Sequence, residues 1–253
     1  MRIYAFANQK GGVGKTTSCL SIGAALAQEG KRVLLVDMDA QGSLTKCAGL
    51  RDLGDLPTVY EVLKGAAPVK DAIRKKERYN VLPSDIRLSG AELELSRAKN
   101  RDHILKFKLV ELQRDYDYIL IDCSPSLSVL TLMALCAADG IILPVAAQYM
   151  SLDGISQLLE TIKTVRNTRI NPSLQISGVI ITMYDSRRSL DREVSEAIRK
   201  RFPQTFKTEI RINSKLAEAP AFGNDIFEYS PKSAGAAAYQ AIANELLERE
   251  ASK

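Results

Sequence analysis

The sequence predicts an α/β protein with a doubly wound, mostly parallel β-sheet and helices on both faces. Short apolar, β-branched runs alternate with helical patterns along the 253 residues, as in repeated β-α-β units. Several of these runs are continuously apolar, which is typical of strands buried on both faces. Apolar residues make up 45% of the chain and charged residues 26%, as in soluble globular proteins, and we expect residues 1–253 to form a single domain.

The expected strands are apolar, β-branched runs that are bounded by turn residues or charges. The run from Tyr118 to Ile121 is a strong example, because it contains no charge and ends at Asp122. The six expected strands lie at 3–7, 31–37, 79–83, 116–122, 140–145 and 176–182.

Helical periodicity fills the gaps between these runs. Gly30 is expected to end the first helix, because glycine adopts the left-handed conformation that terminates helices. Residues 50–76, which are rich in Gly and Pro, are expected to form an irregular insertion. The predicted helices are Thr16–Glu29, Leu88–Leu112, one that opens at Ser151, Asp191–Phe202 and Ser233–Glu250.

Composition excludes several functional classes. The chain has one histidine, His103, in a charged stretch, so chemistry that depends on a histidine base or a histidine-rich metal site is not expected. The four cysteines show no C-x-x-C spacing and are expected to be buried thiols in a reducing compartment. No apolar run reaches the roughly 20 residues that cross a bilayer, and the N-terminus is too short for a signal peptide. We therefore expect a cytoplasmic protein with no membrane partner.

A glycine-rich segment lies between the first predicted strand and the first predicted helix. Glycines let successive backbone N–H groups turn inward around phosphate, and the helix N-terminus adds partial positive charge. Lys15 can reach the β- and γ-phosphates of a nucleotide, and the Thr16 hydroxyl can bind Mg²⁺. Gln9 stands where the usual pattern has its first glycine, and the alternative is a glycine-rich turn without a ligand. The segment consists of Lys10, Gly11, Gly12, Val13, Gly14, Lys15, Thr16 and Thr17.

Carboxylates follow two of the predicted strands. Asp37 and Asp39 end one strand, and Asp122 ends another. In an open α/β sheet, ligands bind outside the carboxyl ends of the strands, so these residues are candidates for binding Mg²⁺ and positioning water. The alternative is that they cap the following turns. Cys123 stands where a catalytic Glu would follow the strand-end Asp, so the group that positions water must lie elsewhere.

These motifs resemble the ParA/Soj chromosome- and plasmid-partitioning ATPases, which belong to the MinD/ParA group of P-loop NTPases with a deviant Walker A motif. The resemblance covers nearly the whole chain. Lys10–Thr17 and Leu35–Gly42 are highly specific for the group, whereas Leu216–Pro220 and Tyr229–Ser233 indicate the ParA/Soj branch. The motifs are Lys10–Thr17, Leu35–Gly42, Ile121–Cys123, Leu216–Pro220 and Tyr229–Ser233.

The resemblance implies that ATP and Mg²⁺ are the ligands and that the active species is an ATP-sandwich homodimer. Lys10 resembles the signature lysine that crosses to the partner's phosphates, and Asp39 resembles the residue that orients the attacking water. A lysine that arrives from the partner brings positive charge to the transition state, which couples dimerisation to hydrolysis. Without a strong base, hydrolysis is expected to be slow.

The resemblance also assigns the remaining ligand contacts. Lys15 and Thr17 would bind phosphate, and Asn213 would contact the base. Thr16 would bind Mg²⁺ directly, whereas Asp37 and Asp122 would act through water. The chain departs from the family pattern without losing a reactive group at three positions, which are Ala40, Ser124 and Met133.

A basic segment runs from Arg187 to Lys215. It contains nine basic and four acidic residues, an excess of five that equals the net charge of the whole chain. Such a surface gives sequence-independent, salt-sensitive DNA binding. The resemblance places DNA contacts at Arg187, Lys215 and Lys232, and implies nonspecific double-stranded DNA, the nucleoid and a ParB-type protein that stimulates hydrolysis as partners. The alternative is a solvated helix face.

Other members of the same fold provide competing hypotheses. The main one is a MinD-like protein- or membrane-positioning ATPase, but residues 242–253 are too acidic and too poor in bulky apolar side chains to favour membrane insertion. A nitrogenase-reductase-like protein would need cluster-binding cysteines, which Cys123 and Cys136 do not match. An enzyme like dethiobiotin synthetase is disfavoured by Lys10 and the basic segment. No helix-turn-helix segment precedes the first strand, so operator binding is not expected.

Overall fold

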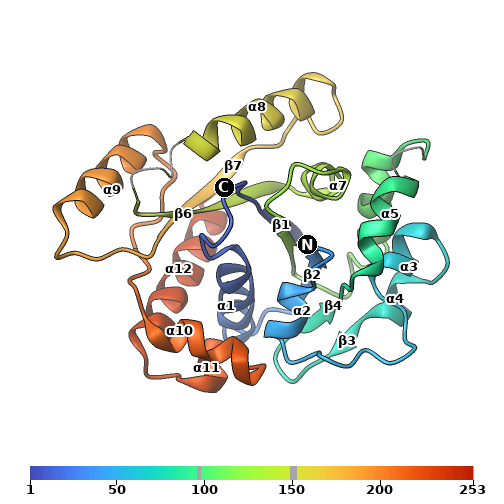
Figure 1. Ribbon diagram of the computed structural model, residues 1–253, viewed down its shortest axis with the longest axis horizontal. Coiled ribbons are helices and arrows are strands. Elements are labelled where there is room, and N and C mark those ends of the chain that lie inside the picture. Colours follow the sequence, from blue (N-terminus) through green and yellow to red (C-terminus); the bar gives the residue numbers. More distant parts are fainter. Residues whose placement is uncertain (96–97, 149–152, 253) are drawn as a thin grey trace.

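The computed structural model describes residues 1–95, 98–148 and 153–252, and within them one seven-stranded sheet lies between two layers of helices (Figure 1). The strands lie in the order β3-β4-β2-β5-β1-β6-β7. All neighbouring pairs are parallel except β3 and β4, which confirms the predicted α/β class. The strands are β1 (Arg2–Phe6), β2 (Val33–Met38), β3 (Arg74–Lys75), β4 (Asn80–Leu82), β5 (Tyr118–Cys123), β6 (Gly140–Ala146) and β7 (Ile176–Thr182).

Twelve α-helices occur in the described part of the chain, together with short 3₁₀ turns at Arg101–His103 and Ala219–Phe222. The helices are α1 (Lys15–Gln28), α2 (Ser43–Cys47), α3 (Val59–Lys64), α4 (Val69–Ala72), α5 (Arg87–Leu95), α6 (Ile104–Val110), α7 (Val129–Ala137), α8 (Asp153–Asn167), α9 (Ser189–Arg201), α10 (Ser214–Glu218), α11 (Ile226–Tyr229) and α12 (Ala234–Ala251). None of these helices is long and apolar enough to cross a membrane.

Both faces of the sheet are buried, which explains why its strands are continuously apolar. Ile119 and Ile121 of β5 belong to one apolar cluster, which includes residues of α3–α8. Leu120 points to the opposite face and belongs to a second cluster with residues of α1, α2, α11 and α12. Successive side chains of a strand alternate between faces, so a strand covered on both sides has no exposed polar set.

The first helix ends where the sequence predicts. Gly30 adopts φ +73°, and its N–H donates a 3.0 Å hydrogen bond to the carbonyl of Ala27. The other end of α1 follows Gly14, which has φ +84°. Left-handed glycines therefore mark both ends, and the one at the start also belongs to the glycine-rich segment.

Two predictions for residues 50–112 are wrong. Leu88–Leu112 is not one helix, because α5 ends at Leu95 and α6 begins only at Ile104. Asn100 between them has φ +54°, a left-handed conformation that an α-helix cannot contain. Residues 50–76 are not wholly irregular, because they form α3, α4 and β3. Thr58 starts α3 with a capping box to Glu61, a local signal that outweighs the glycines and prolines around it.

Three other helices can be compared with their predictions. Helix α9 begins two residues earlier than predicted, and α12 begins one residue later than the expected start at Ser233, which is its N-cap. Ser151 and Leu152 lie outside the described residues, and the helix that they were expected to open is described from Asp153. Figure 1 shows α12 beside α1 on one side of the sheet, and α8 with α7 on the other.

Candidate nucleotide site

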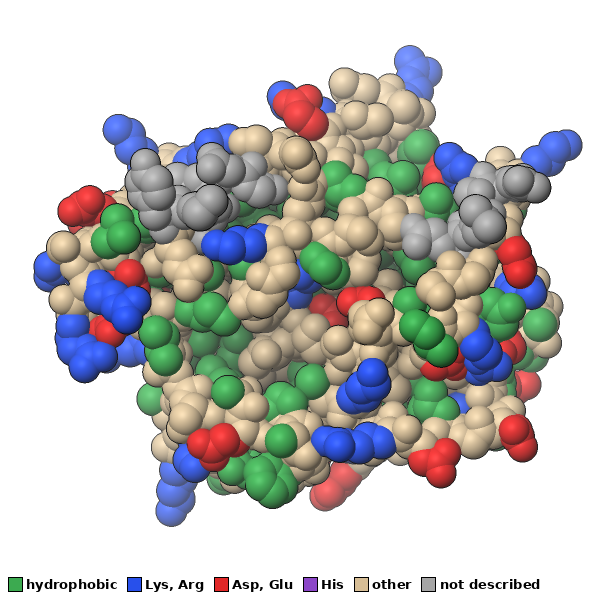
Figure 2. Space-filling view, in the orientation of Figure 1, with side chains coloured by type: hydrophobic (Ala, Val, Ile, Leu, Met, Phe, Trp, Pro, Cys, Tyr) green, Lys and Arg blue, Asp and Glu red, His purple; other side chains and the backbone are tan. Residues whose placement is uncertain are grey.

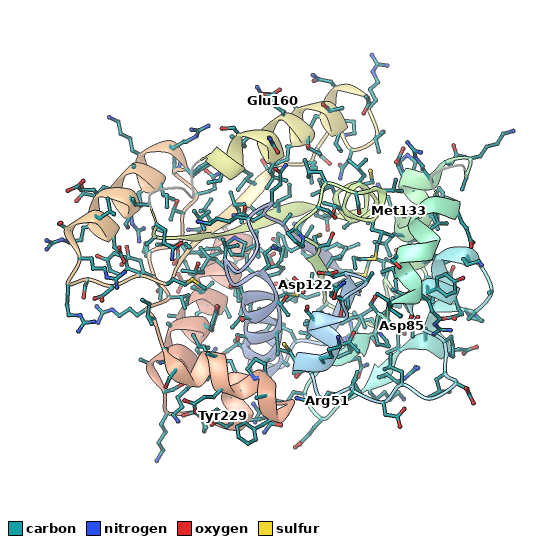
Figure 3. The ribbon with its side chains drawn as sticks, viewed as in Figure 1. Arg51, Asp85, Asp122, Met133, Glu160 and Tyr229 are labelled. Carbon is teal, nitrogen blue, oxygen red and sulfur yellow. The ribbon has the colours of Figure 1, made fainter. Side chains whose placement is uncertain are left out.

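The strand order brings the glycine-rich segment and the aspartates together. β5 lies between β1 and β2, and Asp122 is the register partner of Phe6 on one side and of Asp37 on the other. All three strands end at the same edge, so residues 7–14 after β1 lie beside both carboxylates. Figure 3 labels Asp122 at the centre of this face, and Figure 2 shows acidic side chains in the same central position.

The glycine-rich loop is open on its outer side. Gly12 has φ +72°, which favours glycine, yet an added Cβ at Gly11 or Gly12 would meet nothing within 4 Å. The packing of the chain therefore does not explain these glycines, whereas close approach of a phosphate does. Two anchors hold the loop. Asn8 Nδ2 donates to the carbonyl of Pro144 at 2.7 Å, and Thr182 Oγ1 donates to that of Val13 at 2.9 Å.

Sequence reasoning missed both anchors. Asn8 also accepts a 3.0 Å hydrogen bond from the backbone N–H of Lys10, so it shapes the loop from inside. The available signal was a polar residue directly after the first strand. Thr182 is the last residue of β7, and its signal was a hydroxyl at the end of an apolar run.

Both loop lysines contact their own chain. Lys15 Nζ lies 3.3 Å from the carbonyl of Lys10, and burial lowers the pKa of Lys15 despite the opposing effect of Asp122. Its ammonium group is therefore desolvated beneath the loop, where a bound anion would stabilise it. Lys10 is partly exposed, and its Nζ donates to Gln148 Oε1 at 3.3 Å.

Asp122 is the most unusual carboxylate of the site. It is 1% exposed, and its Oδ2 accepts a 2.7 Å hydrogen bond from Thr16 Oγ1. Its Oδ1 is buried and has no hydrogen-bond partner among the described residues. Burial, followed by the charge of Asp37, raises the pKa of Asp122 well above its ordinary value. A buried carboxylate oxygen beside a hydroxyl fits a divalent cation, which would compensate the charge and occupy the free lone pairs.

Asp37 has a different environment, because both of its oxygens are already used. Oδ2 accepts hydrogen bonds from the N–H and the hydroxyl of Thr45, at 2.8 and 2.7 Å, and Oδ1 accepts one from the N–H of Asp39 at 3.1 Å. Burial raises the pKa of Asp37 to about 6, and the bonds from Thr45 oppose that rise. Asp37 therefore anchors α2, and a role toward Mg²⁺ through water stays a prediction.

The site needs a ligand to complete any metal shell. Among the described residues, no group of three or more His, Cys, Asp and Glu side chains is arranged to hold a metal ion. Magnesium commonly takes one or two protein oxygens and completes its octahedron with water and substrate phosphates. Thr16 and Asp122 are consistent with that pattern. All four cysteines are free, and three are buried as expected, whereas Cys47 is partly exposed.

Asp39, Thr17 and Asn213 are the other candidates at this edge. Asp39 is partly exposed, and its Oδ1 accepts a 3.0 Å hydrogen bond from Gln41 N–H. Thr17 lines a small cavity with Leu216 and other residues of the segment that follows Asn213. Asn213 caps α10 by accepting from Lys215 N–H at 2.8 Å. Their roles toward nucleotide stay predictions.

The positions that depart from the family pattern fit their surroundings. Met133 is fully buried in α7, within the apolar cluster under the sheet. Ser124 Oγ lies 2.9 Å from Ser126 Oγ in the loop after β5. Ala40 is partly buried against the same cluster as Met133.

The basic residues predicted to contact DNA lie on the surface. Figure 2 shows Lys and Arg side chains gathered over α9. The Arg187 side chain is 88% exposed and forms a 2.8 Å ion pair with Asp185. Lys215 forms a 2.8 Å ion pair with Glu218 at the start of α10, and Lys232 is exposed.

The chain is similar to known proteins over nearly its whole length. The sequence model of a family described as "AAA domain" matches residues 1–176. The chromosome partitioning protein ParA of Caulobacter vibrioides is 43% identical over 255 residues, which cover 99% of this chain and 95% of that protein. This chain belongs to the ParA/Soj family of ATPases. The sporulation initiation inhibitor protein Soj of Bacillus subtilis is 44% identical, over 97% of this chain and 98% of Soj.

Solved structures confirm the P-loop NTPase fold of this ParA/Soj member. One named cobyrinic acid a,c-diamide synthase from Mycobacterium smegmatis, solved with a bound ATP analogue and magnesium, is 39% identical with a TM-score of 0.87; the match covers 100% of this chain and 96% of that one. The cell division ATPase MinD of Pyrococcus furiosus is 25% identical with a TM-score of 0.79, over 98% and 99% of the two chains.

Proposed function

We propose that the protein is an Mg²⁺-dependent ATPase that segregates DNA, and that residues 1–253 form a single ATPase domain. The observation that carries the nucleotide part is the unpartnered oxygen of Asp122 beside Thr16, next to an open glycine loop at the start of α1. The names of the relatives, chromosome partitioning protein ParA and Soj, support DNA segregation as the purpose of the cycle.

The loop binds the phosphates of ATP. The N–H groups of residues 11–14 and the start of α1 provide donors and partial positive charge, and Lys15 adds a full charge. When ATP binds, the Lys15 ammonium group replaces its 3.3 Å contact with the neutral carbonyl of Lys10 by contacts with the anionic phosphates. These contacts compensate the cost of desolvating the ammonium group. Thr16 would bind Mg²⁺ directly, and Asp37 and Asp122 would act on it through water. Thr17 would bind the phosphates, and Asn213 would contact the base. When bound, the metal neutralises phosphate charge and orients the nucleotide.

Hydrolysis requires a second copy of the chain. Asp39, partly exposed after β2, orients the attacking water. Lys10 leaves the neutral Gln148 and reaches the phosphates that the partner subunit binds. The described residues of the site include no histidine to act as a base, so turnover stays slow until a ParB-type partner protein stimulates it.

The dimer then binds nonspecific double-stranded DNA on the nucleoid through Arg187, Lys215 and Lys232. Two of these cations are already paired with acids on the surface. Surface ion pairs contribute only about 0–1 kcal/mol, so DNA phosphates can replace the carboxylates at little cost. Neutralising DNA phosphates releases the counterions condensed on the DNA, so this binding should depend strongly on salt.

A DNA mobility shift at low and moderate salt, with ATP, ADP or no nucleotide, tests the proposal. We expect a shift with ATP that weakens steeply as salt rises. Arg187→Glu should lose this shift and still dimerise with ATP. Lys70→Glu is the matched control, because Lys70 is an exposed, ion-paired cation on α4, which Figure 1 places on the other side of the molecule from α9. Equal binding by both variants would place the DNA site elsewhere.

The alternative, a MinD-like positioning ATPase, predicts ATP binding without DNA binding under any nucleotide. The structure gives no free apolar helix for a membrane at α12. Ile242 and Leu246 are buried against the core, and the Tyr239 hydroxyl lies 3.0 Å from Ser18 Oγ of α1. ATP binding that leaves DNA mobility unchanged in every condition would favour a protein-positioning role instead.

A further inference from the structure

Two segments on the nucleotide side of the molecule touch each other backbone to backbone. Gly49 lies just after α2, and Gly223 directly follows the 3₁₀ turn Ala219–Phe222. The two glycines have φ +80° and +72°, and a Cβ added to either would lie 2.7 Å from the backbone of the other. Glycine permits this close approach together with a left-handed backbone. The crossing therefore joins the segment after α2 to the segment after α10.

Arg51 connects the same two segments a second time. Its Nη2 donates to the carbonyl of Ala221 at 2.7 Å and lies 3.4 Å from the carbonyl of Pro220. The last carbonyls of a short helix have few backbone donors, and a cationic side chain is favourable there. Figure 3 labels Arg51 on the same side of the molecule as Tyr229 of α11.

The segment that carries Gly49 and Arg51 is fixed to the sheet. Thr45 of α2 donates to Asp37 at the end of β2, through its N–H at 2.8 Å and its hydroxyl at 2.7 Å. Lys76, in the turn between β3 and β4, donates to the carbonyl of Ala48 at 2.6 Å. Arg51 therefore projects from a supported part of the chain, and its hydrogen bond limits where the other segment can lie.

The other segment borders the phosphate loop. Leu216 and Pro220 line a small cavity together with Thr17, which lies in the first turn of α1. We call residues 213–224 the base segment, because it begins at Asn213, the residue proposed to contact the base. A shift of the base segment away from α2 would change its distance from the phosphate loop.

We propose that Arg51 is a positioning residue for the nucleoside part of the bound nucleotide. Through the carbonyls of Ala221 and Pro220, it holds the base segment at the distance from the phosphate loop that a ribose and a base require. Because it acts on the base segment and not on the phosphates, its effect is confined to ligands that carry a nucleoside. This inference rests on the proposed binding of ATP at the phosphate loop.

Calorimetry of the full-length chain in Mg²⁺, with ADP or with pyrophosphate, tests this role. Both ligands have two phosphates and only ADP has a nucleoside, so their comparison isolates the base segment. ADP also avoids hydrolysis during the titration. We expect the natural chain to bind ADP more tightly than pyrophosphate. Arg51→Ala should weaken ADP about tenfold, as expected for a lost hydrogen bond from a charged donor, and should leave pyrophosphate affinity unchanged.

Two further variants separate positioning from general stability. Arg51→Lys keeps the charge and a donor but loses the planar guanidinium, so it should restore part of the ADP affinity. Arg74→Ala is the matched control, because Arg74 also donates to two backbone carbonyls, those of Ala72 and Pro57, both at 2.9 Å. Arg74 belongs to β3, at the edge of the sheet, and is less exposed than Arg51. Its loss should lower the free energy of unfolding in urea and leave the ratio of ADP to pyrophosphate affinity unchanged.

Hydrogen exchange of the base segment provides an independent measurement. The N–H groups of Gly223 and Asn224 donate to carbonyls of the preceding turn, at 3.1 and 3.2 Å. Their exchange should be faster in Arg51→Ala than in the natural chain, and unchanged in Arg74→Ala.

Three results would overturn the proposed role of Arg51. They are unchanged ADP affinity in Arg51→Ala, an equal loss of affinity for ADP and pyrophosphate, and a natural chain that binds ADP no more tightly than pyrophosphate. A natural chain that binds neither these ligands nor ATP would contradict the proposed ATPase function itself. Failure of the positioning role and failure of the proposed function are therefore distinguishable.

Discussion

Replacing Asp122 with asparagine should make the nucleotide-free protein more stable and its magnesium-nucleotide complex weaker. The variant chain, D122N, keeps an oxygen to accept the hydrogen bond from Thr16 and loses a buried charge that has an unpartnered oxygen. Most substitutions at buried positions destabilise, so a gain in stability at a fully buried residue would be a specific signature of a ligand-dependent carboxylate.

The magnitude follows from the register of the strands. Asp122 lies opposite Asp37 on neighbouring strands. Such strands are about 4.8 Å apart. Two unit charges at that separation repel by about 3 kcal/mol at an effective dielectric constant of about 20. Burial is the first cause of the rise in the pKa of Asp37 from 3.8 to about 6, which corresponds to a separate desolvation cost of about 3 kcal/mol. We therefore expect D122N to gain about 1–3 kcal/mol at pH 7 without metal.

The pH dependence has a definite sign. A carboxyl whose folded pKa exceeds its unfolded pKa binds protons more strongly when folded, so its ionisation lowers stability as pH rises. The natural chain should therefore lose stability as pH rises from about 4, first through the pKa of Asp37 near 6 and further as Asp122, whose pKa is also raised, ionises. The advantage of D122N should shrink toward pH 4, where Asp122 is protonated in the natural chain.

Urea unfolding at pH 4 to 7 in EDTA, and at pH 7 with Mg²⁺ and ATP, measures both effects. Ligand at 100 times its Kd stabilises the natural chain by about 2.7 kcal/mol, and D122N should gain much less, so the order of stability reverses. Asp139→Asn is the control, since Asp139 is an exposed aspartate just before β6 that accepts a hydrogen bond from Ile3 N–H. Loss of more than about 1 kcal/mol in EDTA, which is the usual effect of a substitution, or an unchanged response to Mg²⁺ and ATP, would refute the reasoning.

Three further substitutions, with a fourth as a control, test the rest of the site and the fold. Lys15→Ala should abolish ATP binding in calorimetry, because it removes the one buried cation under the loop among the described residues; retained micromolar affinity would contradict the phosphate-loop interpretation. Asp39→Ala should bind ATP and dimerise in light scattering but release no phosphate, and hydrolysis at the natural rate would exclude its proposed role. Gly223→Ala should destabilise by about 1–3 kcal/mol in urea, because Gly223 has φ +72° and its Cβ would lie 2.7 Å from Gly49 Cα. Gly90→Ala in α5, where a Cβ meets nothing, should be neutral or stabilising by up to about 1 kcal/mol, and equal losses at both glycines would undermine the steric argument.

The sequence predicted the strands of the sheet, whose apolar residues form continuous runs. Six strands lie where the apolar runs predict them, because strands buried on both faces need uninterrupted apolar residues. The break between Leu95 and Ile104 was not predictable from composition, since Leu, Glu, Lys and Arg favour a helix on both sides of Asn100. The edge strand β3 has two residues and follows from pairing with β4, which no local pattern reveals.

The candidate site shows the same division between local and long-range information. Asp37, Asp122 and the glycines are visible in the sequence because they directly follow strands. Their hydrogen-bond partners depend on the order of the strands: Thr16 meets Asp122 across 106 residues, and Thr182 reaches Val13 across 169. The distinct environments of the two aspartates, one fully hydrogen-bonded and one with a free oxygen, could not be deduced from their matching positions at strand ends.

That difference bears on how the proposed switch works. The Asp37 carboxylate accepts hydrogen bonds from the backbone N–H and the hydroxyl of Thr45. The Thr45 hydroxyl in turn accepts one from the N–H of Ser84 at 2.9 Å. This chain of hydrogen bonds fixes α2, and with it the segment that carries Asp39, to the body of the sheet. Asp122 instead has a free oxygen and a raised pKa, so its energy changes most when a cation arrives. A site with one carboxylate fixed and one unsatisfied fits the proposed binding of magnesium-nucleotide. Because the described residues of the site offer neither a histidine nor a second buried carboxylate with a free oxygen, the proposed mechanism assigns hydrolysis to Asp39, to Lys10 of a second copy and to a stimulating partner protein.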